Sequence, residues 1–253
     1  MLPRGVAMTD VVRVDVSSAA VDYRPAAGEQ RCVPARDLSS ATVFRAVPWR
    51  TFRWYYGQRH YSGTYWSSTE RDHVIYESRL ELANLVLADF DPTVHHIAAQ
   101  PFRLTAVVDD EQRRHIPDYA WDTDEGPIVV DVVRKERMTH PRIVSLCSWT
   151  REVVESLGWS YLVVNEPDAV RVANVRFLSG YRRDELINPA ILRDLRCRRA
   201  DLVGLSMVEA EQLVGGHPQP LVRAALLCMV WRGEFSVDLD LPLNRSTPLG
   251  DKR

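Results

Sequence analysis

The sequence lacks several features that would place it in a class at once. No CxxC pair occurs among its four cysteines, Cys32, Cys147, Cys197 and Cys228, which argues against a zinc site or a small disulfide-bonded scaffold. No apolar run approaches the roughly 20 residues of a membrane span, and the first residues, MLPRGVAMTD, lack the apolar segment of a signal peptide. We therefore expect a cytoplasmic protein with reduced thiols and no membrane partner.

An excess of charge of one sign is absent too. The chain has 32 basic and 34 acidic residues, a formal net charge of -2 at pH 7 and a pI near 6.4. Nucleic-acid-binding domains are often basic overall, so any contact with DNA must depend on local patches. With 253 residues, of which 45% are hydrophobic, the chain is long enough for two domains that each bury a core.

Changes in periodicity divide the chain into three parts. Residues 1–45 mix proline, serine, alanine and charge without a sustained period, and they predict a weakly ordered N-terminal arm. Residues 46–182 alternate between helical and strand patterns, and residues 183–253 are mainly helical in pattern. The sequence thus predicts an arm, an α/β domain and a C-terminal module.

The α/β part predicts a mixed sheet flanked by helices. Helical spacing of apolar residues runs over 70–88 and 142–157, whereas strand patterns occupy 97–108, 113–121, 127–133 and 159–164. The run Ile128, Val129, Val130 fits a strand that is buried on both faces. The helix between the last two strands indicates one parallel crossover, so the fold class is α/β.

The C-terminal part predicts a winged-helix-like module. Helices are expected over 189–195, 206–214 and 220–231, followed by a hairpin over 233–241 that would form the wing. A basic run could contact DNA phosphates, or it could form a solvated helix face; its members are Arg193, Arg196, Arg198 and Arg199.

Residues 43–66 are rich in aromatic side chains interspersed with arginine and glycine. Aromatic rings and arginines can stack on nucleotides. Aromatic residues are also ordinary core and strand residues, so these rings could simply pack against the α/β domain as a lead-in strand.

Three carboxylates form the most informative chemical pattern. They are Glu77 on the first predicted helix, Asp118 in a Pro-Asp step at the return strand, and Asp131 on the next strand. Converging carboxylates repel one another unless a cation neutralises them, and Mg²⁺ prefers such oxygen ligands. Asp131 lies inside the apolar run IVVDVV, where an unpaired carboxylate is costly to bury. Alternatively, Asp131 forms a salt bridge with Arg134 or Lys135 at the strand end.

Longer motifs around these acids resemble a known family. YESRLELANLVLADFDPTVHHIAAQPF (76–102), HIPDYAW and IVVDVV are similar to the TnsA-like endonuclease subunit of heteromeric transposases. This family belongs to the restriction-endonuclease-like PD-(D/E)xK superfamily. The similarity runs over about 43–181, and 221–243 is similar to the tail of such proteins.

The resemblance implies a metal-dependent DNA endonuclease that cuts one strand at each transposon end. Glu77, Asp118 and Asp131 would hold Mg²⁺, with Mn²⁺ as an alternative ion, and the carbonyl of Val132 would be an extra ligand. Gln100 of the QPF motif would be a structural or DNA-facing neighbour. The implied partners are double-stranded DNA, a DDE-type transposase subunit and an ATPase regulator of transposition.

One position departs from the family pattern. Val133 stands where the family has its catalytic lysine. Lys135 follows on the same strand face as Asp131 and is the predicted substitute, whereas Arg134 would face the other way on a regular strand. Three hypotheses remain open: an active endonuclease, a catalytically degenerate subunit that binds DNA or the transposase, and a winged-helix regulator with an unrelated α/β domain.

Overall fold

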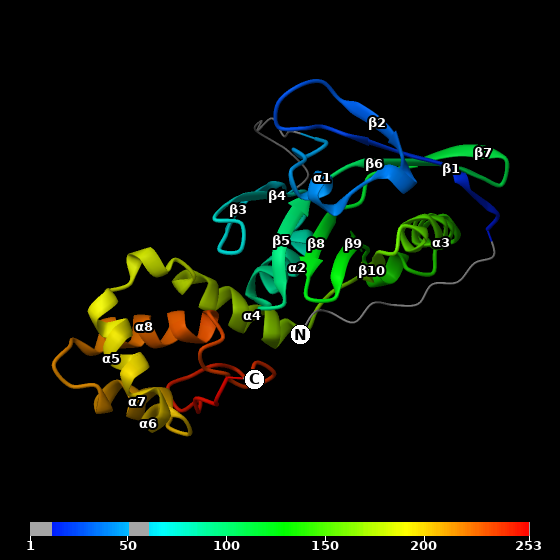
Figure 1. Ribbon diagram of the computed structural model, residues 1–253. Helices are drawn as coiled ribbons and strands as arrows, with labels where there is room; N and C mark the ends of the chain where they lie inside the picture. Colours follow the sequence, from blue (N-terminus) through cyan, green and yellow to red (C-terminus); the bar gives the residue numbers. More distant parts are fainter. Residues whose placement is uncertain (1–11, 51–60, 253) are drawn as a thin grey trace. The chain divides into compact units, whose positions relative to one another are not determined.

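The computed structural model describes residues 12–50 and 61–252, which form a mixed α/β protein (Figure 1). The chain divides into two compact units, unit 1 from Met1 to Pro167 and unit 2 from Asp168 to Arg253. Within the described residues, no helix is long and apolar enough to cross a membrane. The sequence had suggested a boundary between residues 182 and 183, so helix α4 (Ala169–Leu178) belongs to the second unit rather than the first.

One sheet of unit 1 is antiparallel and has the strand order β2-β1-β6-β7. Its strands are β1 (Val14–Tyr23), β2 (Arg31–Pro34), β6 (Arg103–Val108) and β7 (Glu111–His115). The turn between β6 and β7 contains Asp109 and Asp110, whose φ angles of 49° and 63° fit the two-residue hairpin turn that matches strand twist. The turn lies between the strand patterns that the sequence predicts over 97–108 and 113–121.

The predicted weakly ordered arm is wrong for residues 12–45, and residues 1–11 lie outside the described part of the chain. Strand β1 pairs with both β2 and β6, and a short helix, α1 (Ser40–Phe44), follows. The partner strand β6 lies about 80 positions further along the chain, since Val21 pairs with Leu104. Local periodicity could not reveal this pairing, because β1 is stabilised by distant residues.

The second sheet of unit 1 is mixed and has the order β10-β9-β8-β5. Its strands are β5 (Val94–Ala99), β8 (Tyr119–Thr123), β9 (Gly126–Val132) and β10 (Ser160–Val164). Strands β9 and β10 are parallel and are joined through α3 (Pro141–Ser156), which confirms the predicted crossover. The other neighbours, β5 with β8 and β8 with β9, are antiparallel.

Helix α3 joins the two sheets into one core, because it packs against β10 of the mixed sheet and β1 of the antiparallel sheet (Figure 1). Most apolar side chains of the shared core come from β1, β6, β9, β10 and α3, and others come from flanking segments. Among its fully buried members are Val21, Phe102, Leu104, Val129, Trp149, Val153 and Val163.

A third element of unit 1 is a hairpin of β3 (Gly63–Ser67) and β4 (Asp72–Tyr76), which precedes α2 (Arg79–Phe90). The helix predicted over 70–88 is therefore correct only from Arg79 onward. The β-branched Val74 and Ile75 fit the strand better than the first turns of a helix. Ser78 caps α2, and its side chain accepts a hydrogen bond from the Glu81 N–H group.

The buried carboxylate of Asp89 fastens this hairpin to α2. It accepts hydrogen bonds from the Tyr65 hydroxyl (2.8 Å), the Ser67 hydroxyl (2.6 Å), and the N–H groups of Ser68 (3.0 Å) and Thr69 (2.8 Å). Every donor comes from the hairpin, so one side chain fixes the position of the β3–β4 turn on the helix.

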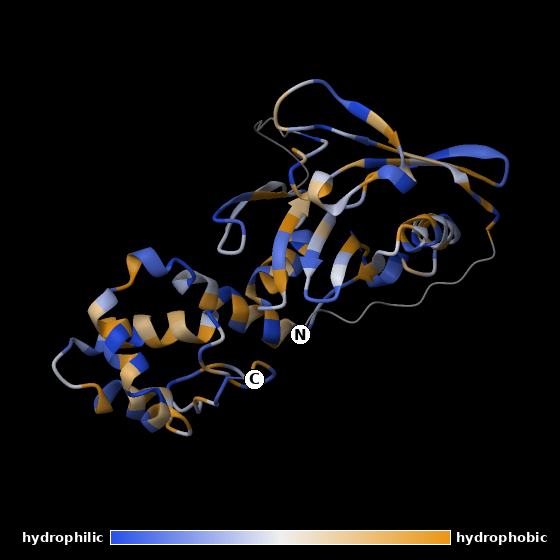
Figure 2. Cartoon of the chain, viewed as in Figure 1, coloured by the Kyte–Doolittle hydropathy of each residue, from blue (hydrophilic) through white to orange (hydrophobic). Residues whose placement is uncertain are grey.

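Unit 2 is helical in its described residues. Besides α4, it contains α5 (Pro189–Cys197), α6 (Arg199–Leu202), α7 (Met207–Leu213) and α8 (Gln219–Trp231). Figure 2 shows that α8 is largely hydrophobic, and its residues from Ala225 to Trp231 are buried. The three predicted helices are confirmed as α5, α7 and α8.

The predicted hairpin over 233–241 is wrong. Among the described residues of unit 2 there is no strand, only isolated bridges such as Ser236 with Gly250. The backbone of Asp238 to Leu241 instead meets α4, where the Asn174 side chain donates to the carbonyl groups of Leu239 and Leu241 at 2.8 Å each. The side-chain contacts of Asn174 replace a strand partner, so the wing of a winged helix does not form.

Candidate functional site

A cavity of about 280 Å³ lies in unit 1 where the mixed sheet meets α2 and α3. It combines three acidic, two basic and one histidine side chain with an apolar wall from α3. These polar residues are Glu81, His115, Asp118, Asp131, Arg134 and Arg137. Two of the three predicted acids, Asp118 and Asp131, therefore share one cavity.

Asp118 lies between β7 and β8 and is fixed through its backbone and its side chain. Its carbonyl accepts the Gln100 N–H group at 2.9 Å, and its Oδ2 accepts the Val132 N–H group at 2.7 Å. Val132 can make this bond because the β8–β9 pairing ends at Tyr119 and Val130. Burial raises the pKa of Asp118 well above its ordinary value, and the negative charges of Asp131 and Glu81 raise it further.

Asp131 lies on β9 with only 3% of its surface exposed. The His115 Nε2 atom lies 2.9 Å from its Oδ1 and 2.7 Å from its Oδ2, and the Tyr161 hydroxyl donates to Oδ2. Both carboxylate oxygens thus have partners, which explains how a carboxylate is accommodated inside an apolar strand. The suggested salt bridge to Arg134 or Lys135 is not formed; His115 takes that place.

Glu81 is the acid that the sequence interpretation missed. It lies in the first turn of α2, where its Oε2 accepts the Glu77 N–H group at 2.6 Å. Burial raises the pKa of Glu81, although hydrogen bonds from Glu77 and Ser78 act in the opposite direction. The pattern Ser78-x-x-Glu81 is a helix-start signature that could have placed this carboxylate in the first turn.

Glu77 does not line the cavity, although it was the predicted third acid. It precedes the cap of α2, and its Oε1 accepts hydrogen bonds from the Gln100 side chain (2.5 Å) and from Arg50 (3.3 Å). Gln100 is 5% exposed and also binds the backbone N–H of Arg50 through its Oε1. Gln100 is therefore a structural neighbour of the site, and Glu77 is held by partners of its own.

Lys135 does not fill the place of the missing lysine. The prediction assumed that β9 continues past Asp131, but the strand ends at Val132 and a 3-10 turn covers Lys135–Arg137. The Lys135 side chain is exposed and does not line the cavity, and Val133 is partly buried against the core. The basic residues that do line it, Arg134 and Arg137, were not selected from the sequence.

The chemistry of the donors fits a hard divalent cation. Glu81, Asp118 and the Val132 backbone offer oxygen atoms at one cavity, and the pKa of Asp118 is raised partly because the neighbouring acids repel its charge. Within the described residues, however, no three His, Cys, Asp or Glu side chains are gathered as a ligand group. Asp131 in particular is engaged by His115 and Tyr161, so its part in holding a cation is indirect or requires those bonds to change.

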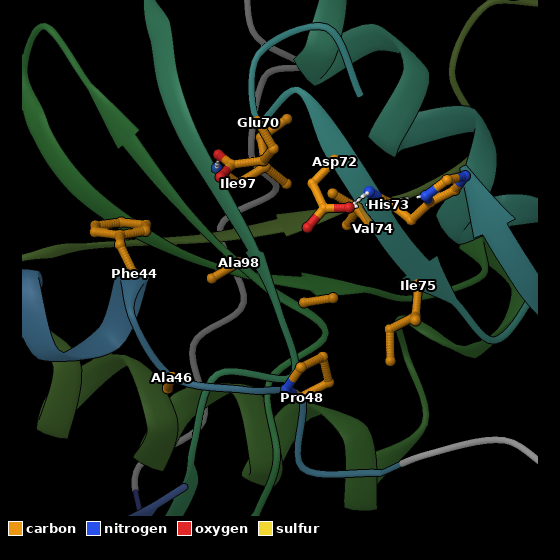
Figure 3. A pocket seen from close by; sticks show the side chains of 11 residues that line it. Phe44, Ala46, Pro48, Glu70, Asp72, His73, Val74, Ile75, Ile97 and Ala98 are labelled. Atoms are coloured by element: carbon orange, nitrogen blue, oxygen red, sulfur yellow. Dashed lines mark hydrogen bonds and ion pairs between the residues drawn. The ribbon is translucent and has the colours of Figure 1, made fainter. Parts of the chain in front are cut away.

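A second cavity, of about 140 Å³, lies between α1, β4 and β5 (Figure 3). Its acids have partners: Glu70 accepts the Ile97 N–H group at 2.5 Å and lies 3.4 Å from His96, and Asp72 lies 3.7 Å from His73. The wall is otherwise apolar, with Phe44 among its side chains. The larger cavity combines three acids with two arginines, whereas the described residues that line this one include no arginine, so the larger cavity is the better candidate.

The basic run of unit 2 is mostly engaged inside the unit. Arg196 forms a paired contact with Glu234 at 2.7 and 2.8 Å, Arg199 bonds Asp251 and the Glu234 carbonyl, and Arg198 bonds the Leu213 carbonyl. These contacts favour the solvated-face interpretation over phosphate binding for this run.

The aromatic stretch is only partly described, since residues 51–60 lie outside the described part. Trp49 lies between the guanidinium groups of Arg24 and Arg103, at 4.9 and 4.8 Å from its ring centre. Tyr65 bonds Asp89. Trp49 and Tyr65 therefore serve packing within unit 1, whereas Tyr61 is 56% exposed, with the Arg79 guanidinium 4.5 Å from its ring centre.

Comparison of the chain with protein-family models and with curated proteins finds no match.

Proposed function

We propose that the chain is a metal-dependent DNA endonuclease whose site is the larger cavity of unit 1. The observation that carries this proposal is the group of acids, Glu81, Asp118 and Asp131, which share a cavity although their charges repel. A fold tolerates such crowding where a cation or a reaction benefits from it. The mixed sheet, with Asp118 before β8 and Asp131 on β9, is consistent with a restriction-endonuclease-like fold.

In the proposed hydrolysis of the phosphodiester, each of these residues has a separate role. Glu81 and Asp118, with the carbonyl of Val132, would hold Mg²⁺ or Mn²⁺, which would acidify the attacking water and stabilise charge on the leaving oxygen. His115 and Tyr161 orient Asp131 beside Asp118. The Val132 N–H group fixes the rotamer of Asp118, so the carboxylate is positioned before a substrate arrives.

The wider biological role rests on the sequence resemblance alone. Under that resemblance the protein nicks one strand at transposon ends in the cytoplasm, beside a DDE-type transposase subunit and an ATPase regulator of transposition. Unit 2, without a wing, would serve as a helical module that contacts DNA or the transposase.

Plasmid nicking tests the proposal directly. Supercoiled DNA is incubated with the protein and Mg²⁺ or Mn²⁺, with and without the DDE-type subunit. We expect Asp118→Asn and Glu81→Gln to lower the nicking rate about 100-fold or more, as loss of a charge-stabilising group does in other enzymes. Glu77→Gln is the matched control, because Glu77 lies near the site but does not line the cavity, and it should retain activity within about tenfold.

A second candidate function is a non-catalytic assembly subunit that binds DNA or the transposase. The observation in its favour is that both oxygens of Asp131 have partners and that, among the described residues, no lysine lines the cavity. Absence of nicking under every metal and partner condition, together with retained DNA binding, would select this function and reject the nuclease.

A further inference from the structure

We propose that Arg134 and Arg137 form a clamp for a single phosphodiester group of duplex DNA at the larger cavity. The inference rests on the proposed function for its ligand class, and it assigns the positive charge of the site to two residues outside the family pattern. Both side chains line the same cavity as Glu81, Asp118 and Asp131.

The geometry of the turn after β9 places these two arginines together. Arg134 caps the 3-10 turn Lys135–Arg137 and precedes Arg137 by three residues. The Arg137 N–H group donates to the Arg134 carbonyl at 2.9 Å and closes the turn, and both arginines line the cavity, whereas Lys135 between them does not.

Hydrogen bonds and burial hold this turn in place. The Lys135 N–H group donates to Glu166 at 2.8 Å, and the Arg137 N–H group donates to the Arg134 carbonyl at 2.9 Å. Met138, the next residue, is buried in the core at 8% exposure. The backbone of the turn that carries both arginines is therefore held in place, which lowers the conformational entropy lost when a phosphate is bound.

The two guanidinium groups retain charge for a ligand. Arg137 forms no ion pair with any described residue, and Arg134 is 66% exposed and only 3.9 Å from the exposed Glu136. In unit 2, by contrast, Arg196 and Arg223 each share two short hydrogen bonds with a carboxylate. A planar guanidinium fork matches the oxygen pair of a phosphodiester.

The first turn of α3 adds to the positive potential at this place. Ile143 lines the cavity from that turn, which contains no acidic residue to offset the partial charge of the helix N-terminus. An isolated anion would meet the carboxylates, and an isolated cation would meet the arginines. A phosphodiester accompanied by a cation satisfies both sets of charges, and removal of one carboxylate, as in Asp118→Asn, lowers the repulsion that a phosphodiester meets without the cation.

Binding of a fluorescein-labelled 20-base-pair duplex, followed by anisotropy over a range of salt concentrations in EDTA, tests the clamp. The parent is the Asp118→Asn variant, which removes one repelling charge and prevents cleavage. We expect Arg137→Gln to weaken binding about tenfold and to lower the slope of log affinity against log salt by about 0.9, the value for one lost phosphate contact. Arg134→Gln together with Arg137→Gln should weaken binding further but lower the slope by no more than about 0.9 in total, because both arginines bind the same phosphodiester.

Lys135→Gln is the matched control, because it removes the same charge from the same exposed turn. Its slope should change by less than half as much as that of Arg137→Gln. Equal changes in the two variants, no change in the arginine variants, or no binding by the parent would overturn the clamp. Thermal unfolding confirms that each variant is folded; if Arg137→Gln is not, Arg137→Lys should keep the salt slope and still lose affinity.

The salt-slope and nicking experiments distinguish a failure of the clamp proposal from a failure of the nuclease proposal. Nicking by the wild type with an unchanged salt slope in the arginine variants would reject the clamp and keep the nuclease. A reduced slope in Arg137→Gln with no nicking by the wild type would keep the clamp and reject the nuclease.

Discussion

Buried and half-buried acids are arranged in opposite ways in the two units. In unit 1, burial and the charges of Asp131 and Glu81 raise the pKa of Asp118. In unit 2, the hydrogen-bonded Arg196 lowers the pKa of Glu234, and Glu211, with 1% of its side chain exposed, bonds Arg223 at 2.5 and 2.7 Å. Acids face acids in the first case, and they face arginines in the second.

This difference separates groups that stabilise the fold from groups that the fold only tolerates. A carboxylate whose pKa is lowered by its partners, as for Glu234, favours the folded state at neutral pH. A carboxylate held against two others opposes folding at neutral pH. Burial by itself does not distinguish the two, since Asp89 is 5% exposed, close to the 3% of Asp131, and is stabilised by its donors.

The largest effect is expected where a satisfied acid is removed. Asp89→Ala leaves three hydroxyl and two N–H donors without their acceptor, so we expect a loss of about 3 kcal/mol in the free energy of unfolding. Urea denaturation followed by circular dichroism measures it. Asp72→Ala is the control, because its side chain is 83% exposed on the same hairpin, and it should change stability by less than about 0.5 kcal/mol. Equal effects would contradict the anchoring role of Asp89.

A smaller loss is expected in unit 2. Glu211→Gln keeps the volume of the side chain but removes the charge that binds Arg223, so unit 2 should be destabilised by about 2 kcal/mol. Arg223 is 40% exposed and regains water, which keeps the loss below that of a fully buried pair. Hydrogen exchange of peptides from α7 and α8 reports this unit alone. Unchanged exchange would show that the pair adds nothing.

The opposite sign is expected for Asp118→Asn. The amide removes the repulsion from Asp131 and Glu81 while its oxygen still accepts the Val132 N–H group. Without added metal at pH 7, the free energy of unfolding should rise by about 1 kcal/mol. A destabilised variant in urea denaturation would mean that the acids of this cavity are not in conflict.

The smallest effect is the pH dependence of that difference. A pKa raised by folding means that the folded state keeps a proton that the unfolded state has lost. The contribution of Asp118 and Glu81 to the free energy of unfolding is therefore fully present below their ordinary pKa of about 4. It is lost as the pH rises through their raised pKa values in the folded state. The advantage of Asp118→Asn should therefore shrink as the pH falls toward 4. An advantage that is constant between pH 4 and 8 would contradict the raised pKa.

The strands and helices with strong local patterns could be predicted from the sequence. The apolar run before Asp131 gave β9, and the helix between two apolar runs gave the parallel crossover. The same reasoning failed for β1, whose partner β6 is remote in sequence, and for β4, whose apolar spacing also fits a helix. Local patterns decide elements only where distant pairing does not compete.

The sequence predicted only those residues of the candidate site that stand in strong local patterns. Asp118 and Asp131 stand out because a Pro-Asp step and an apolar strand surround them. Glu81 was passed over for Glu77, since the start of α2 was placed too early, and His115 was missed because its contact with Asp131 crosses from one sheet to the other. Lys135 was predicted on the assumption that β9 continues past Val132. The sequence of β9 alone does not fix where it ends, because the end of a strand depends on its neighbouring strands.

The most direct test of the account is whether a divalent cation relieves the crowded acids of unit 1. Thermal unfolding of the wild type is compared with and without Mg²⁺ or Mn²⁺ at about ten times the dissociation constant, where binding adds about 1.4 kcal/mol. We predict a rise of about 3 to 6 °C in the midpoint for the wild type and for Glu77→Gln, and no rise for Asp118→Asn or Glu81→Gln. An equal rise in all four proteins, or none in the wild type, would contradict a cation site built from Glu81 and Asp118.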